Sequence, residues 1–140
     1  MSASGNPRSP EGKRYQGLKA WTACHELFLD VHRRTELWPR SERCALASQA
    51  RRAAFSAAVH IVEGCSRNTA KQFKSFLSLS LGSLAELSYT LLAARDVGLL
   101  SIGSYGEVEA LRDHANQLTW GLYRAVSQRA SKPAVVRKRE

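Results

Sequence analysis

Seven polar residues recur on two stretches of the chain that are otherwise rich in small and apolar side chains. They are Gln49, Arg52, Ser56, His60, Glu63, Ser83 and Glu86. Gln49, Ser56 and Glu63 are seven residues apart and therefore share one face of a helix. An imidazole close to carboxylates can perform acid–base chemistry or bind a metal ion. Polar side chains along an Ala-rich helix can instead form a buried hydrogen-bonded strip that sets packing register, because buried polar groups normally pair with one another. We favour this structural polar strip.

Metal binding is not supported by the spacing of the histidines and carboxylates. Di-iron bundle sites repeat a Glu-x-x-His motif on two helices. This chain has a single His60-x-x-Glu63 in the reverse order and no second copy. His25 and His32 are about two helical turns, or roughly 10.5 Å, apart, which is too far for one ion. We therefore expect no metal and no cofactor.

Nucleophilic catalysis has no recognisable motif in the sequence. No GxSxG elbow, phosphate-binding glycine loop or dinucleotide fingerprint occurs. Cys24, Cys44 and Cys65 sit on apolar faces or at helix ends, where thiols are usually inert. We expect a protein without enzymatic activity or a small-molecule substrate.

The cysteines and the apolar segments also indicate a cellular setting. Three cysteines without close spacing do not form a secreted disulfide framework. Residues 1–16 lack the apolar core of a signal peptide, and no run of about 18 apolar residues predicts a membrane span. The expectation is a reduced, cytoplasmic protein without membrane contact.

The strongest functional signal is charge. The chain has 21 basic and 12 acidic residues and a formal net charge of +9. Basic clusters near predicted helix ends and in the C-terminal tail can contact phosphates without reading sequence. The candidate contacts are Arg51, Arg67, Lys71, Lys74, Arg137, Lys138 and Arg139. The alternative interpretation is an ordinary solvated surface. No helix-turn-helix or zinc-finger pattern indicates sequence-specific readout.

Apolar residues at alternating steps of three and four predict the helices that would carry these side chains. Four helices are predicted, over residues 18–38, 42–66, 69–97 and 104–130. Short connections between helices of this length imply an all-α, antiparallel up-down-up-down four-helix bundle. We assign this bundle to residues 17–130, preceded by a disordered leader (1–16) and followed by a basic disordered tail (131–140).

Local residues suggest where these helices begin and end. Ser41, Thr69 and Ser104 are the predicted N-caps, and Gly98 is the predicted left-handed C-terminal residue. The small residues of 42–66 predict close contact with at least two neighbours. The wide leucine surface of 69–97 either is buried in the bundle or faces another subunit.

The order of several short motifs resembles a known bacterial family. The motifs are Leu18-x-x-Trp21, Trp38-Pro39-x-x-Glu42, Leu46-x-x-Gln49-x-x-Arg52-Ala53-x-x-Ser56, Ile61-Val62-Glu63-Gly64 with Arg67, Phe73-x-x-Phe76-Leu77 and Gly82-Ser83-x-x-Glu86-Leu87. Together they resemble the four-helix bundle proteins encoded in intervening sequences of 23S ribosomal RNA genes. Through that family, the chain is similar to the accessory variability proteins of diversity-generating retroelements. His60 and Val62 depart from the Asn and Ala that the family usually has there.

The resemblance implies properties that the residue patterns do not establish. It implies a ring-like homopentamer with a positively charged surface and no established enzymatic activity. For retroelement members it implies binding to a reverse transcriptase and to nucleic acid. We therefore expect a non-enzymatic, oligomeric accessory protein that binds RNA or DNA, working with a reverse transcriptase or with ribosomal RNA. The alternative is a structural protein–protein interaction module, for which the leucine surface, Trp120 and Tyr123 are the candidate contacts.

Overall fold

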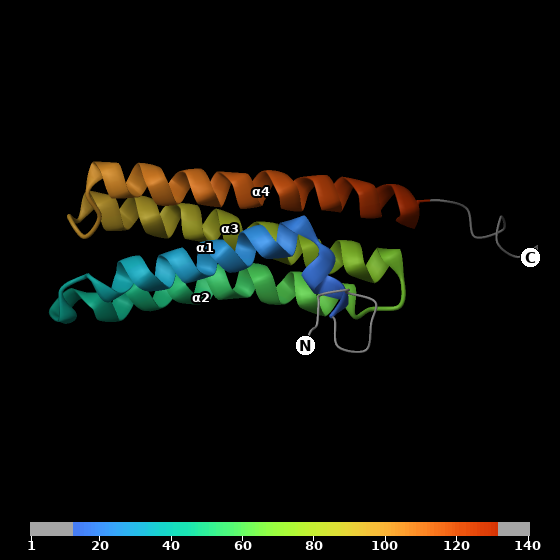
Figure 1. Ribbon diagram of the computed structural model, residues 1–140, viewed down its shortest axis with the longest axis horizontal. Coiled ribbons are helices and arrows are strands. Elements are labelled where there is room, and N and C mark those ends of the chain that lie inside the picture. Colours follow the sequence, from blue (N-terminus) through green and yellow to red (C-terminus); the bar gives the residue numbers. More distant parts are fainter. Residues whose placement is uncertain (1–12, 132–140) are drawn as a thin grey trace, which may run out of the picture.

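The computed structural model of the protein describes residues 13–131, apart from the side chains of residues 41–44. It contains a short 3-10 helix, η1 (Arg14–Gly17), and four α-helices. They are α1 (Lys19–Glu36), α2 (Arg40–Cys65), α3 (Ala70–Asp96) and α4 (Ile102–Ala130). Each helix runs opposite to the one before it (Figure 1), so the predicted all-α, up-down-up-down bundle is confirmed.

The antiparallel order brings distant parts of the sequence together at each end of the bundle. α2 contacts α1 and α3, and α4 contacts α3 and α1. One end therefore holds η1, the beginning of α1, the α2–α3 turn and the end of α4 (Figure 1). The other end holds the α1–α2 and α3–α4 connections.

The core explains why α2 is rich in alanine. Ala50, Ala54 and Ala57 are fully buried, and they allow α3 to approach closely. Leucines of α3 fill the space between the helices, including Leu77, Leu84 and Leu87, each with no exposed surface. Most of the wide leucine surface is therefore used within the protomer. Leu79, with 52% of its surface exposed, faces outward instead.

Helix α3 also satisfies the length and composition criteria for a membrane span. Core helices of bundles meet the same criteria. Here the apolar side chains of α3 pack against α2 and α4, and the buried Ser80 hydroxyl donates a 2.7 Å hydrogen bond to the Ala57 carbonyl. These contacts account for the apolar character of α3 within the bundle.

Two predicted helix ends are confirmed. The Thr69 hydroxyl accepts a hydrogen bond from the Gln72 amide, which caps α3. At the other end, Gly98 has a φ of 90°, and Leu99 and Gly98 donate to the carbonyls of Ala94 and Arg95. This is the Schellman arrangement, and it requires the left-handed conformation that glycine adopts readily.

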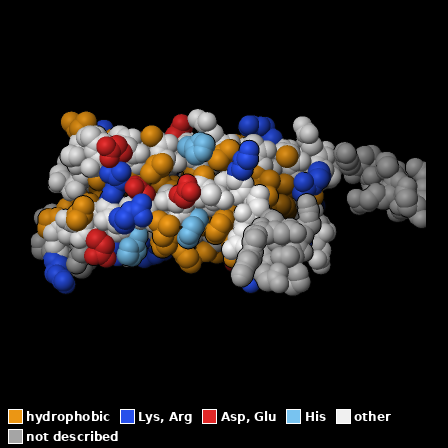
Figure 2. Space-filling view, viewed as in Figure 1, with side chains coloured by type: hydrophobic (Ala, Val, Ile, Leu, Met, Phe, Trp, Pro, Cys, Tyr) orange, Lys and Arg blue, Asp and Glu red, His pale blue; other side chains and the backbone are white. Residues whose placement is uncertain are grey.

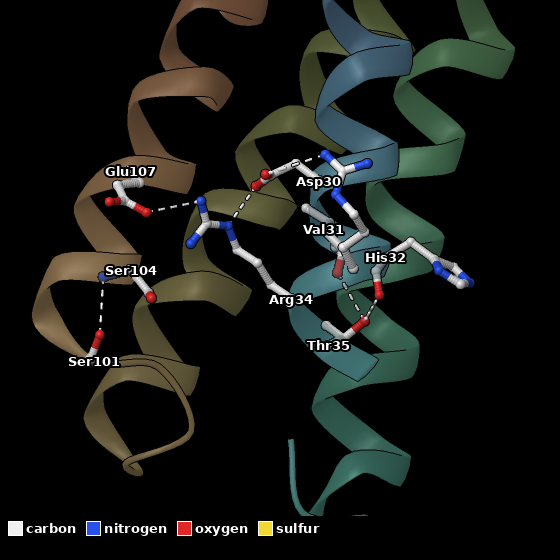
Figure 3. A network of polar contacts seen from close by, with 9 residues as sticks. Asp30, Val31, His32, Arg34, Thr35, Ser101, Ser104 and Glu107 are labelled. Atoms are coloured by element: carbon white, nitrogen blue, oxygen red, sulfur yellow. Dashed lines mark hydrogen bonds and ion pairs between the residues drawn. The ribbon is translucent and has the colours of Figure 1, made fainter. Parts of the chain in front are cut away.

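Three boundaries differ from the sequence-based expectation. α2 begins at Arg40 after Pro39, so Ser41 is not its N-cap. α4 begins at Ile102, and the Ser101 hydroxyl accepts the Ser104 amide hydrogen, so Ser104 is not the N-cap either (Figure 3). Ser101 is the N-cap because its backbone is extended, as the capping position requires. η1 extends the helical part of the chain back to Arg14 and contacts α1 and α2, whereas the predicted bundle begins at residue 17; residues 1–12 lie outside the described part.

The position of the α4 cap gives a direct test. Ser101→Ala should lower the free energy of unfolding by about 1 kcal/mol, because the Ser104 amide loses its acceptor. Ser104→Ala is the matched control and should change stability by less than about 0.5 kcal/mol. Urea unfolding followed by circular dichroism measures both variants. A larger loss in Ser104→Ala would contradict the assigned cap.

Candidate nucleic-acid interface

The charges of the described chain are distributed unequally between the two halves of the bundle. One half comprises residues 13–27, 53–83 and 116–131 and contains the α2–α3 turn; we call it the basic half. Its cationic residues are Lys13, Arg14, Lys19, Arg67, Lys71, Lys74, Arg124 and Arg129. Its only acidic residues are Glu26 and Glu63. The excess of positive charge therefore lies at one end of the bundle.

The remaining half, residues 28–52 and 84–115, is neutral by sequence. Its basic residues are Arg33, Arg34, Arg40, Arg43, Arg51, Arg52, Arg95 and Arg112. Its acidic residues are Asp30, Glu36, Glu42, Glu86, Asp96, Glu107, Glu109 and Asp113. Figure 2 shows the same difference on one face, where red side chains accompany most of the blue ones on the left but not at the right-hand end. We call this half the neutral half.

Ion pairs strengthen this contrast. In the neutral half, Arg34 lies between Asp30 and Glu107, with nitrogen–oxygen distances of 2.6 Å and 3.1 Å (Figure 3). Partial burial opposes the charged form of Arg34, but the two carboxylates outweigh it and raise the pKa of the guanidinium. Arg112 pairs with one carboxylate of its own helix, Glu109, at 2.8 Å, and its Nη1 donates to the Leu84 carbonyl of α3. Arg34 and Arg112 therefore link α4 to α1 and α3.

No cationic residue of the basic half forms an ion pair with another described residue. Arg67 and Lys71 are exposed, and Lys74 is half-buried. Two of them rest on aromatic faces: Arg67 lies 4.8 Å from the Phe76 ring centroid, and Lys74 lies 5.7 Å from that of Tyr123. Such contacts position a cation without neutralising it. Their positive charge is therefore available to an external anion.

Arg51 occupies a different environment from the other predicted contacts. Its Nε donates a 2.7 Å hydrogen bond to the buried Thr35 hydroxyl, and its Nη2 lies 3.0 Å from a Glu36 carboxylate oxygen. Nη2 also donates to the His32 carbonyl. Arg51 thus links α2 to the end of α1, and its charge is already compensated. The structure separates it from Arg67, Lys71 and Lys74; Arg137, Lys138 and Arg139 lie outside the described residues.

The predicted polar strip is only partly a packing feature of the protomer. The Ser83 hydroxyl donates to the Ser56 hydroxyl at 2.9 Å, which links α3 to α2, and His60 Nδ1 lies 2.9 Å from a Glu63 oxygen. The expectation of a continuous buried strip is wrong for the other three members. Gln49, Arg52 and Glu86 are exposed. On α2 the buried positions beside Gln49 and Arg52 are alanines, and on α3 the buried positions beside Glu86 are leucines, including Leu87.

Several features of the basic half were not singled out from the sequence. Arg124 and Arg129 come from the last turns of α4, and Lys19 from the start of α1. A groove of about 710 Å³ along α4 is lined by His114, Asn116, Gln117, Leu118, Trp120 and Arg124. Summing charges separately for each end of an antiparallel bundle would have found these cations. The groove depends on side-chain packing and leaves no such sequence signal.

The structure offers little for catalysis or metal binding. Within residues 13–131, no group of three or more His, Cys, Asp or Glu side chains is placed to hold a metal ion. Cys24 is fully buried, with its sulfur 3.8 Å from the Thr119 hydroxyl oxygen, and burial raises the pKa of its thiol to about 11. Burial also raises the pKa of Cys65. A raised pKa disfavours the reactive thiolate.

The Cys24 thiol predicts a specific alkaline destabilisation. Its pKa is higher in the folded protein than the roughly 8.5 of an unfolded chain, so the protonated thiol favours folding. That stability is complete below about pH 8.5 and is lost as the pH rises through about 11. We expect the wild-type protein to lose about 2–3 kcal/mol more than Cys24→Ala between pH 8 and pH 11. Urea unfolding at the two pH values measures this difference, and parallel losses would contradict it.

Together, the fold and charge distribution define a small four-helix bundle with a cationic end. A model of the 23S rRNA-intervening sequence protein family matches residues 16–121. The chain belongs to this family, and the resemblance to it drawn from the sequence motifs is confirmed. No curated protein matches the chain closely enough to count as a relative.

Proposed function

We propose that this protein is a non-enzymatic nucleic-acid-binding protein that contacts phosphates with the basic half of its bundle. The observation that carries the proposal is the set of eight cationic residues there, which share no ion pair with a described carboxylate. Lys and Arg in such positions replace the counterions that surround a nucleic acid. The family name associates the chain with ribosomal RNA genes and favours RNA as the ligand.

The geometry supports binding to the backbone rather than reading of base sequence. Arg67 lies in the α2–α3 turn, Lys71 in the first turn of α3 and Arg129 in the last turn of α4. These side chains belong to three different segments, so no single helix presents them to a groove. Phosphate contacts of this kind fix position and carry no direct sequence information.

A salt titration tests this proposal. Binding of a structured RNA hairpin is measured by fluorescence anisotropy at several salt concentrations. With about four phosphate contacts, the affinity should fall between tenfold and about a hundredfold from roughly 50 mM to 200 mM salt. An affinity independent of salt, or no binding at low salt, would refute the proposal.

Self-association is a further part of the proposed function. The outer face of α3 exposes Leu79 and Tyr89, with 52% and 71% of their surfaces accessible, and the Ser56–Ser83 hydrogen bond joins this helix to α2. We expect this face to contact other copies in a homo-oligomer; the family resemblance implies a pentamer. Several copies of a weak site would then bind one nucleic acid with high avidity. Light scattering that shows a monomer would refute this part.

The proposed partner of the assembled protein is either ribosomal RNA or a reverse transcriptase with its nucleic acid. Both candidate partners are suggested by the family resemblance. The alternative function, a protein–protein module without nucleic-acid binding, is favoured by the same exposed α3 face. Self-association without any salt-dependent RNA binding would select that alternative.

A further inference from the structure

A continuous series of aromatic rings runs along α1 and reaches α2. The Trp21 and His25 rings are stacked, with centroids 4.9 Å apart and planes 8° apart. Tyr15 contacts the edge of Trp21 at one side, and Phe28 follows His25 at 6.5 Å. Phe55 of α2 completes the series, 5.5 Å from Phe28. We call these five residues the aromatic groove residues.

The rings line a concave surface, although Trp21 and Phe28 also pack against the edge of the core. A groove of about 310 Å³ lies between η1, α1 and α2, and its other lining residues are Ala58, Val59 and Val62. Phe55 has 54% of its surface exposed, although it belongs to the largest class of apolar side chains. Figure 2 shows hydrophobic and histidine side chains gathered along the lower edge, over α1 and α2. The core of the protomer does not account for this exposed aromatic surface.

The charges near the groove indicate an anionic occupant. None of the eight lining residues is acidic. Lys13 and Arg14 directly precede Tyr15, and Arg14 is close enough to Cys65 at the end of α2 for its charge to oppose the rise in thiol pKa that burial causes. The Tyr15 end of the groove therefore belongs to the basic half.

We propose that this groove binds the unpaired bases of single-stranded nucleic acid, with Phe55, Phe28 and Trp21 as the stacking residues. Every nucleobase has a face that can stack on an aromatic ring, and the flanking cations would contact the phosphates of the same strand. A base within a duplex is stacked on its neighbours and cannot enter. This inference rests on the proposed function and adds to it a preference for unpaired segments.

Phe55→Ala gives the first test, because an exposed side chain can be removed without opening the core. The probes are a twelve-nucleotide oligouridylate, the same length of oligodeoxyuridylate and an RNA duplex of equal length. Loss of one aromatic stacking partner should weaken single-strand binding about tenfold and leave duplex binding within twofold. Phe55→Trp should retain single-strand binding.

The RNA and DNA strands provide a second comparison. Stacking alone should give them similar affinities. A large preference for RNA would show that the 2′-hydroxyl is recognised and would overturn stacking as the basis of binding.

Leu37→Ala is the control, since Leu37 is an exposed apolar residue in the neutral half, outside the face proposed for self-association. Its single-strand to duplex affinity ratio should equal that of the wild-type protein. Equal weakening of single-strand and duplex binding in Phe55→Ala would overturn the inference but leave the proposed function standing. If charge reversal in the basic half abolished binding and Phe55→Ala had no effect, the inference would also be overturned and the proposed function would stand.

Tryptophan fluorescence provides an independent readout at the groove. In a Trp120→Phe background, Trp21 is the only tryptophan of the described residues that is not buried, because Trp38 is 6% exposed. Oligouridylate should quench the Trp21 emission with the same midpoint as binding. Binding without quenching would overturn the inference. Unchanged affinity of Phe55→Ala together with loss of self-association would assign the groove to a second copy of the chain.

Discussion

Replacing Arg67 and Lys71 together by glutamate is expected to weaken binding of a structured RNA at least about a hundredfold near 0.1 M salt. Both side chains are exposed at the α2–α3 turn, and neither is paired with a described carboxylate. The change removes two phosphate contacts and adds like-charge repulsion, each of which costs several-fold in affinity. The slope of log affinity against log salt should also become shallower by about 2.

A charge-matched variant separates a local effect from a general one. Arg33→Glu with Arg40→Glu changes the net charge by the same amount in the neutral half. Arg33 makes only a 3.7 Å contact with Asp30 and is 70% exposed, so little folding stability depends on it. RNA affinity should fall less than about tenfold in this variant. Equal losses in both variants would show that binding follows overall charge and not the basic half.

The second large effect concerns folding. Gly64 is buried where α2 packs against the start of α3, and a Cβ atom there would be 2.7 Å from Phe73 Cδ1 and 2.9 Å from Phe76 Cβ. Neither atom can move away easily, because Phe76 Cβ is attached to the backbone of α3 and the Phe73 ring packs against the core. Gly64→Ala should therefore lower the free energy of unfolding by about 2 kcal/mol, despite the better helix propensity of alanine.

Gly121→Ala is the control for that substitution. A Cβ atom at Gly121 would meet nothing within 4 Å, and the residue is exposed on α4. This change should raise the stability by about 0.5–1 kcal/mol, because alanine restricts the unfolded chain and favours helix. Denaturant midpoints compare the two. A gain of stability in Gly64→Ala would show that α2 and α3 are further apart than described.

Part of the candidate site was predictable because its basic residues are close together in the sequence. The Thr69 cap predicts a turn there, and the structure keeps three cations around that turn, namely Arg67, Lys71 and Lys74. Arg51 looked equivalent by charge, yet its guanidinium is committed to Thr35 and Glu36. Its partners lie 15 and 16 residues earlier, on another helix. No local pattern reveals such a pairing.

The polar strip also shows what helical spacing leaves undetermined. Helical spacing correctly placed Ser56 on the side of α2 that meets Ser83. Helical spacing does not determine the rotation of α2 about its own axis relative to α3, because that rotation depends on how all four helices pack. Gln49 and Glu86 consequently face solvent in the protomer.

The sequence by itself determined the total charge, which is a sum over its residues. It also determined the four helices, the Thr69 cap and the glycine turn at Gly98, because these depend on neighbours within about one helical turn. Tertiary structure alone decided which charges remain available. Arg34 pairs with Glu107 across 73 residues, whereas the cations of the basic half pair with no carboxylate of the described residues. It also placed Phe55 beside Phe28 and so formed the aromatic groove. The physical reason is that neutralisation and concavity arise between helices, and only the packed bundle sets those distances.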